Sequence, residues 1–224
     1  MKKNALSLFA ITFIAMSLIS QNSYRILDKQ NSNLNQNNND TDSNNHDYVS
    51  RDLLTYGVLS LKEGESGKRV NINVYEANGK TWKVLKLNES IYKLIDPYSV
   101  NIDYDNLVLR VLKEEKGFYK VIINEKKGLV KYIRKTDNSF TFDTWGAHIL
   151  KVFSVDFDSK TNPILADPSP TSTKLDYDSD EFYQPIEIKN EWLKIKWGSD
   201  GKNKYGWIKW KSKNRLLLSL YYTS

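Results

Sequence analysis

Tryptophan and lysine alternate in two short segments near the C-terminus of the chain. The segments read WLKIKW at residues 192–197 and GWIKWK at residues 206–211. Side chains of a strand point alternately to its two faces, so one face of each segment carries Trp and Lys while the other is mainly apolar. An indole beside an ammonium group binds ligands by stacking, by apolar contact and by attraction of a carboxylate. The predicted ligand-binding residues are Trp192, Trp207, Tyr177, Tyr183, Lys194 and Lys209.

Burial is the competing explanation for the two tryptophans. An indole on a solvent-side face is costly to expose unless another part of the protein covers it. Trp192 and Trp207 would then contact the predicted helix or the first half of the chain instead of a ligand. One property distinguishes the two explanations, namely whether the protein's own chain buries both rings.

The sequence offers little for catalysis. The chain has no cysteine, which excludes disulfides, thiolate nucleophiles and cysteine zinc sites. Its two histidines are His46 and His148, and no serine lies in a nucleophile motif, so a catalytic triad is not predicted. We expect a structural role for His148. A carboxylate pair for glycoside hydrolysis depends on spatial proximity, and the sequence favours no particular pair.

Four acidic residues have a spacing that is similar to a calcium-binding loop. Asp176, Asp178 and Asp180 are followed by Glu187 at the twelfth position. The sixth position, however, is Glu181 where the loop requires Gly, and the surrounding sequence is strand-like. We therefore expect a solvated acidic loop, with no metal site and no cofactor.

The net charge of +6 is unevenly distributed along the chain. Residues 156–188 contain eight acids and two lysines, whereas residues 189–215 contain nine basic residues and two acids. An acidic segment beside a basic one indicates neighbouring strands and loops that complement each other. A nucleic-acid-binding protein would show one basic face without a matching acidic segment, so nucleic acid is not an expected partner.

The N-terminus has the layout of a secretory signal peptide. Lys2 and Lys3 precede an uncharged, mainly apolar run at residues 5–20, which is shorter than the roughly 20 residues that span a bilayer. We predict a signal peptide at residues 1–22 and a periplasmic or extracellular protein without a membrane span after cleavage; the alternative is an uncleaved anchor. Residues 23–47, which are rich in Asn, Asp and Ser, are predicted to be a disordered tether.

Strand patterns dominate the rest of the chain. Alternating runs flank Asn78-Gly79, which predicts a hairpin. Apolar residues at helical spacing predict one helix over residues 142–153, capped by Asp143 or Thr144. Further strands are predicted at residues 107–112, 118–124, 129–134, 182–188, 192–197, 206–211 and 215–222. The expected fold is mainly β, with a module at residues 48–139, a connecting helix at 140–155 and a second module at 156–224.

Two parts of the chain are similar to each other. When Gly128 is aligned with Gly206, LVKY at residues 129–132 falls on WIKW, and FYKV at residues 118–121 falls on WLKI. The same order of elements predicts a duplicated β module. In this alignment Val130, Tyr132, Ile208 and Trp210 are expected to be core residues.

The second copy resembles bacterial SH3-like domains. The resemblance rests on Trp192-Leu193-Lys194-Ile195, Gly206-Trp207-Ile208 and Asn162-Pro163-Ile164. It implies a small five-stranded barrel, so that the chain would contain two SH3-like barrels joined by one helix. Such domains are commonly attached to exported enzymes that remodel peptidoglycan, where they are thought to bind wall peptides or protein partners. The cysteine peptidases among those enzymes need a Cys, which this chain lacks.

These observations predict an exported, non-enzymatic binding protein. Its ligand would be a peptidoglycan peptide or a protein, held by the face that carries Trp192 and Trp207. The first alternative is a structural or assembly protein that uses the same face as a protein interface, with an oligomeric state that the sequence leaves open. The second alternative is a hydrolase with a carboxylate site in a concave pocket, which would require an acid of raised pKa.

Overall fold

The structure is a computed structural model, which describes residues 50–62, 71–198 and 201–223. The predicted signal peptide at residues 1–22 and the tether at residues 23–47 lie outside the described residues. The described part is mainly β, as the sequence predicts, and residues 48–224 form one compact unit. None of its helices has the length and apolar character needed to cross a membrane.

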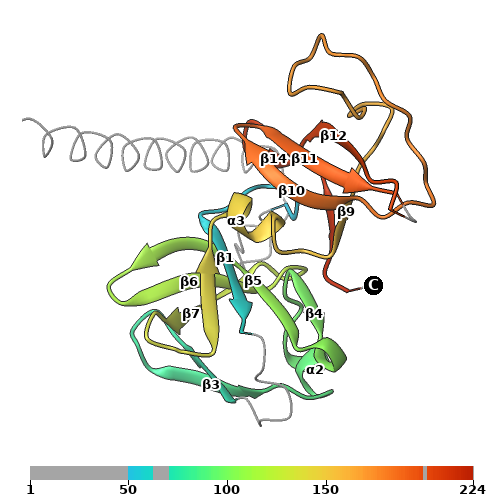
Figure 1. The fold of residues 1–224 in the computed structure, drawn as a ribbon. Coiled ribbons are helices and arrows are strands. Elements are labelled where there is room, and N and C mark those ends of the chain that lie inside the picture. Colours follow the sequence, from blue (N-terminus) through green and yellow to red (C-terminus); the bar gives the residue numbers. More distant parts are fainter. Residues whose placement is uncertain (1–49, 63–70, 199–200, 224) are drawn as a thin grey trace, which may run out of the picture. The chain divides into compact units, whose positions relative to one another are not determined.

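The first half of this unit is an antiparallel sheet of eight strands (Figure 1). Seven strands follow the order β3-β2-β7-β6-β5-β1-β8, and β4 pairs with β5. Their bounds are β1 Gly57–Leu61, β2 Asn71–Tyr75, β3 Thr81–Lys86, β4 Ser99–Asn101, β5 Asn106–Glu115, β6 Phe118–Asn124, β7 Leu129–Arg134 and β8 Phe140–Asp143. The predicted hairpin around Asn78-Gly79 is confirmed, because β2 pairs with β3 and Gly79 has a φ of +79°.

One face of this sheet carries an aliphatic core. Alternate residues of β2, β5 and β6, such as Ile72, Leu109 and Val121, are buried there together with Ile91. Ile91 begins the short helix α2 (Ile91–Leu94), which follows β3, and a 3-10 turn η1 (Ile102–Tyr104) follows β4. The sequence predicts neither of these turns of helix, so the expectation of a single helix is wrong for the described residues.

The predicted helix at residues 142–153 is shorter than expected. The helix α3 spans Trp145–Ile149, and residues 142 and 143 belong to strand β8 instead. Thr144 is the N-cap, and its hydroxyl accepts a hydrogen bond from the Ala147 N–H at 3.4 Å. Trp145 and Ile149 are buried, as their spacing predicts.

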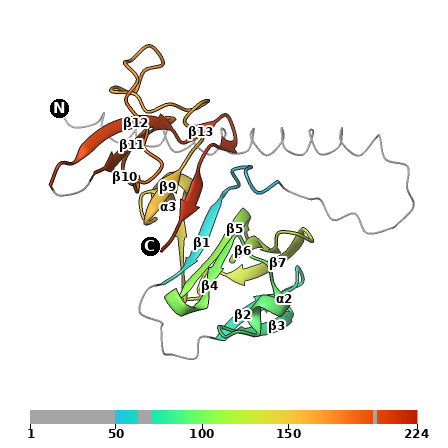
Figure 2. The ribbon, with the colours of Figure 1, turned by 90° about the vertical axis from the view of Figure 1, so that its right-hand side faces the viewer.

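The second half contains shorter strands and a long irregular connection (Figure 2). Strands β10, β11 and β12 form a three-stranded antiparallel sheet, β13 pairs with β14, and β15 pairs with β9. Their bounds are β9 Ser154–Asp156, β10 Gln184–Lys189, β11 Trp192–Trp197, β12 Lys204–Lys209, β13 Lys211–Ser212, β14 Arg215–Leu216 and β15 Ser219–Tyr221. The connection from β9 to β10 returns to the sheet midway, where Leu165 forms bridges with Trp207 and Lys174.

A common hydrophobic core joins the two halves. Val58 of β1 and Val108 of β5 belong to the same buried cluster as Trp145 of α3 and Ile195 and Ile208 of the second sheet. The helix therefore lies within a continuous core. The division into modules at residues 48–139 and 156–224 stays a prediction.

The two similar hairpins have different registers. In the first hairpin, Lys120 of β6 pairs with Tyr132 of β7. The residue aligned with Lys120 in the second hairpin is Lys194 of β11, which pairs with Trp207 of β12. Trp207 is aligned with Leu129 and not with Tyr132. The shift is three residues, and an odd shift reverses the face to which each side chain points.

The shift changes which residues enter the core. Ile208 and Trp210 are buried, as predicted. Val130 and Tyr132 are only half-buried, and Ile133 occupies the core in their place, so the prediction for the first copy is wrong.

Candidate functional site

The two tryptophans of the predicted binding face are buried. Trp192 is 8% exposed and Trp207 is 9% exposed, and both pack with Leu165 in a small separate cluster. The backbones of Leu165 and Trp207 exchange two hydrogen bonds of 2.8 Å, which hold this part of the β9–β10 connection against β12. Of the two explanations that the sequence leaves open, burial by the protein's own chain therefore holds for both rings. The covering segment does not follow from strand alternation, which identifies only the face.

The lysines predicted beside the tryptophans do lie there. The Lys194 ammonium is 5.7 Å from the centre of the Trp207 ring, and the Lys209 ammonium is 5.2 Å from that of Trp192. Lys209 also pairs with Glu191 at 2.7 Å. The Lys194 ammonium is equally close to the Tyr205 ring, at 5.7 Å, and Lys209 has an acidic partner as well.

A shallow cleft of about 470 Å³ remains at the edge of Trp192. Its lining includes Pro168, Lys189 and Lys211. Trp207 is absent from the described lining, so the two tryptophans do not share one groove. Ligand binding by Trp192 stays a prediction, restricted to this edge.

The predicted tyrosines lie in a different cluster from the tryptophans. Tyr183 is buried in the large core, and Tyr177 stacks on it with the ring centres 5.5 Å apart. The Tyr183 hydroxyl accepts a hydrogen bond from the Asp178 N–H at 2.8 Å and donates one to the Asp178 carbonyl at 2.9 Å. Burial raises the pKa of the Tyr183 hydroxyl. Tyr183 thus positions the backbone of the acidic loop.

A second cleft, of about 460 Å³, opens beside this acidic loop. We call it the acidic–aromatic cleft. It is lined by Phe153, Asp178, Asp180, Glu181, Phe182 and Trp197, among others. Three carboxylates line it against one ammonium, that of Lys196, so its local charge is opposite to the chain's net charge of +6.

Aromatic rings form the apolar part of the acidic–aromatic cleft. Phe182 is 63% exposed and meets Phe153 edge to face at 5.5 Å. Trp197 is buried, and its ring lies 5.5 Å from that of Tyr183. An exposed phenylalanine beside a buried aromatic floor provides a surface on which an apolar group can dock.

Hydrogen bonds fix the walls of this cleft. A Glu181 carboxylate oxygen accepts a hydrogen bond from the Gly198 N–H at 3.1 Å, which links the acidic loop to the end of β11. An Asp178 carboxylate oxygen accepts one from the Asp180 N–H at 3.0 Å. These two bonds fix the Glu181 carboxylate and the turn from Asp178 to Asp180 at the edge of the cleft.

Sequence reasoning missed this cleft. It treats the acidic residues as a solvated loop and assigns Phe153 and Phe182 to the apolar patterns of a helix and a strand. The cleft exists only because the fold brings Phe153, which follows α3, next to Phe182. The one sequence signal is the exposed aromatic that directly follows an acidic run, Asp180-Glu181-Phe182.

His148 contacts two hydroxyl groups inside the protein. Its Nδ1 lies 3.3 Å from Ser60 Oγ, and its Nε2 lies 3.0 Å from the Tyr222 hydroxyl. Burial lowers the pKa of His148 to about 4, so the imidazole is neutral at pH 7. A buried ring with both nitrogens engaged supports the structural role that the sequence predicts.

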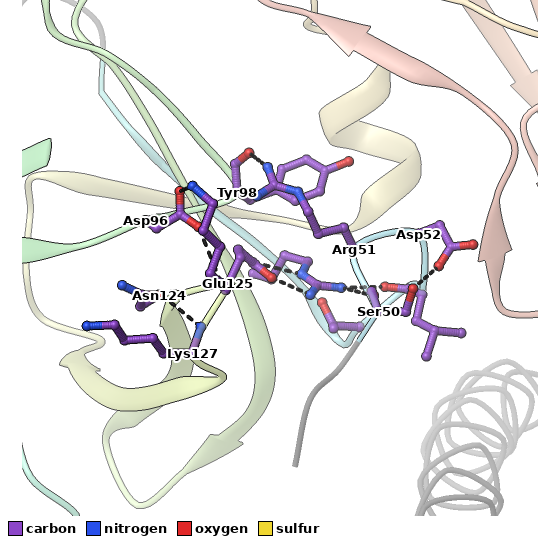
Figure 3. Close-up of polar contacts among 12 residues, drawn as sticks. Ser50, Arg51, Asp52, Asp96, Tyr98, Asn124, Glu125 and Lys127 are labelled. Carbon is purple, nitrogen blue, oxygen red and sulfur yellow. Dashed lines mark hydrogen bonds and ion pairs between the residues drawn. The ribbon is translucent and has the colours of Figure 1, made fainter. Parts of the chain in front are cut away.

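The buried pair of Arg110 and Glu125 forms the most enclosed polar network of the described residues. Arg110 Nε donates to Glu125 Oε1 at 3.0 Å, and its Nη1 donates to the carbonyls of Ser50 and Leu53 at 2.7 and 3.0 Å. Figure 3 shows this network between Ser50 and Glu125. The network ties the start of the described chain to the sheet, and its groups are used for bonds within the protein.

No cluster of His, Cys, Asp and Glu within residues 50–62, 71–198 and 201–223 is arranged to hold a metal ion. Comparisons of the chain with known protein families, with curated proteins and with solved structures find no match.

Proposed function

We propose that this chain is a non-enzymatic binding protein of the cell envelope and that the acidic–aromatic cleft holds its ligand. The observation that carries the proposal is the exposed Phe182 beside three carboxylates. The ligand is a cationic peptide or protein segment, since the cleft is acidic. The charge of this ligand is opposite to the one that Lys194 and Lys209 led us to expect. The ammonium groups of these lysines lie over the rings of Trp207 and Trp192.

We further propose that residues 156–224 form an SH3-like barrel. The proposal is supported by the antiparallel order β10-β11-β12 and by the pairing of β9 with β15, which brings the two ends of this segment together. The predicted signal peptide supports export and makes peptidoglycan peptides with a free amine the expected ligands.

In this mechanism each part of the cleft has its own task. The carboxylates of Asp178 and Asp180 attract an ammonium group of the ligand. Phe182 and Phe153 cover the apolar stem that leads to that ammonium, much as a lysine stem packs on apolar surface. Trp197 forms the floor and reports binding by a change in its fluorescence.

A peptide titration tests the proposal. The probes are a lysine-containing wall tetrapeptide and the same peptide acetylated on the lysine ammonium, which removes its charge. The first should bind the full chain and change the Trp fluorescence, and the second should bind at least tenfold more weakly. Equal binding of both peptides, or of neither, would reject the cleft as an amine site, and turnover of the peptide would support the hydrolase alternative.

Two variants of the cleft have matched controls. Phe182→Ala and Asp180→Asn should each raise Kd by about tenfold, which corresponds to about 1.4 kcal/mol. Tyr104→Ala and Asp103→Asn are the controls, because Tyr104 is an aromatic residue that is 61% exposed and, like Phe182, follows an acidic residue. The controls should bind like the wild type.

The assembly alternative allows the rings of Trp192 and Trp207 to be buried within the chain or between molecules. Leu165 of the same chain packs on both rings. An interface between molecules would therefore use other surfaces, and the assembly alternative stays a prediction.

A further inference from the structure

A second aromatic surface lies on the eight-stranded sheet, on the face opposite its aliphatic core. We call it the cation–aromatic platform. It consists of Tyr75, Glu115, Phe118, Lys120, Tyr132 and Arg134. None of these residues is buried, and Arg134 is exposed.

Strand register places the platform residues in two adjacent rows. In one row Tyr75 pairs with Tyr132, and Tyr132 pairs with Lys120. In the other, Arg134 pairs with Phe118, and Phe118 pairs with Glu115. Directly paired residues on neighbouring strands contact each other, so the rows form one continuous surface.

The rings of the platform support each other and the guanidinium. Phe118 meets Tyr75 edge to face at 5.5 Å and Tyr132 at 6.4 Å. The Arg134 guanidinium lies 4.8 Å from the centre of the Tyr75 ring and 5.8 Å from that of Phe118. The charge is thus held at a defined position over apolar surface.

The charge of the platform is the reverse of that of the acidic–aromatic cleft. The platform carries Lys120 and Arg134, and Lys113 at its border pairs with Glu115. The platform's own residues, two cations and one carboxylate, give a local charge of +1, and that carboxylate is the one paired with Lys113. The cleft, with three carboxylates and Lys196, has a local charge of −2.

We propose that the platform of one molecule receives the acidic–aromatic cleft of a second copy. Phe182 would dock among Tyr75, Phe118 and Tyr132, while the carboxylates beside it meet Lys120 and Arg134. The proposal rests on the proposed function of the cleft as a site for cationic groups and adds a second cationic partner, the platform of another copy of this chain. Because the two surfaces differ, the contact is head-to-tail and produces a closed ring or an open chain of molecules.

Sedimentation analysis of the full chain tests this assembly. At an ionic strength of about 0.05 M the weight-average mass should rise with protein concentration to at least twice the monomer mass. At about 0.5 M it should fall back, because screening weakens charge attraction between exposed surfaces.

Two variants make the test specific. The platform variant is Lys120→Glu with Arg134→Glu, and the cleft variant is Asp180→Asn with Phe182→Ala. Each should remain monomeric alone, while circular dichroism verifies that it is folded. Their equimolar mixture contains one intact pair of surfaces and should form a dimer that grows no further. Lys160→Glu with Lys174→Glu is the control and should assemble like the wild type.

Three results would overturn the proposal. These are a wild type that stays monomeric at low salt, an assembly that neither variant reduces, and a mixture that does not restore the dimer. If the wild type is monomeric but the lysine peptide still binds the cleft, self-association is rejected and the proposed function stands. If neither occurs, both are rejected.

Discussion

His148 connects three parts of the protein. It lies on α3 and contacts Ser60 of β1 and Tyr222 at the C-terminal end of the chain. Asp143 and Lys151 are the charged groups that influence it, and burial exceeds both effects. The protein therefore keeps this imidazole neutral and uses it as a structural contact.

The first prediction concerns the pH dependence of stability. The pKa of His148 is about 4 in the folded protein, whereas the reference value of 6.5 applies to the unfolded chain. Between pH 6.5 and pH 4, His148 therefore gains a proton only in the unfolded chain. Stability should therefore fall as the pH drops from 6.5 to 4, by about 3 kcal/mol from this group. Urea denaturation of the wild type and of His148→Gln at several pH values measures it. If the free energy of unfolding changed with pH in the same way in the wild type and in His148→Gln, the low pKa assigned to His148 would be contradicted.

The second prediction concerns the buried ion pair. Glu125→Gln removes the buried carboxylate charge that pairs with the Arg110 guanidinium and should lower the free energy of unfolding by about 3–5 kcal/mol. Arg110→Met with Glu125→Leu removes both charges and should lower it less. The double variant still leaves the carbonyls of Ser50 and Leu53 without their donor, so limited proteolysis should cut near residues 50–53 faster. A double variant less stable than the single one would count against this explanation.

At the scale of elements, the two glycines of the similar hairpins have different tasks. Gly128 has a φ of +60°, which suits glycine in the tight turn from β6 to β7. Gly206 is needed for space, because a Cβ there would lie 2.4 Å from a methyl of Ile164 and 3.2 Å from the Leu165 carbonyl. The second glycine lets the β9–β10 connection reach the sheet and cover Trp207.

The third prediction separates these two tasks. Gly128→Asn should be less destabilising than Gly128→Ala, since Asn adopts the left-handed conformation more readily than most residues. Gly206→Asn should displace the segment that contains Leu165 and lower the stability by about 1–3 kcal/mol or more. The Trp fluorescence of that variant should also shift to the red as Trp207 gains contact with water. Equal effects of Gly128→Asn and Gly206→Asn would contradict this explanation.

The elements differ in how well the sequence predicts them. The Asn78-Gly79 hairpin and strands β6, β7 and β11 follow from turn residues and alternation, which are local properties. The register of β6–β7 does not, because it also depends on pairing with β5 and β2. The burial of Trp192 and Trp207 depends on Leu165, which is distant in sequence. The short length of α3 also depends on a distant segment, because β1 pairs with residues 140–143.

At the scale of the whole molecule, charge is separated into surfaces of opposite sign. The sequence predicts that the acidic and basic segments complement each other, and one such pair exists, since Glu187 lies opposite Lys194 in the sheet. The acids of the acidic–aromatic cleft, Asp178, Asp180 and Glu181, are not matched by an equal number of basic residues. Lys196 is the one basic residue in the described lining of the cleft. Local separation of charge favours binding of a partner, because it attracts opposite charge at a defined site.

The most direct test of the account is the titration of the full chain with the lysine peptide and its acetylated form, followed by Trp fluorescence. The expected result is binding of the amine form, at least tenfold weaker binding of the acetylated form, and about tenfold weaker binding of the amine form by Phe182→Ala. The control Tyr104→Ala should bind like the wild type. Binding that is unchanged in Phe182→Ala, or that does not distinguish the two peptides, would contradict the assignment of the acidic–aromatic cleft as the ligand site.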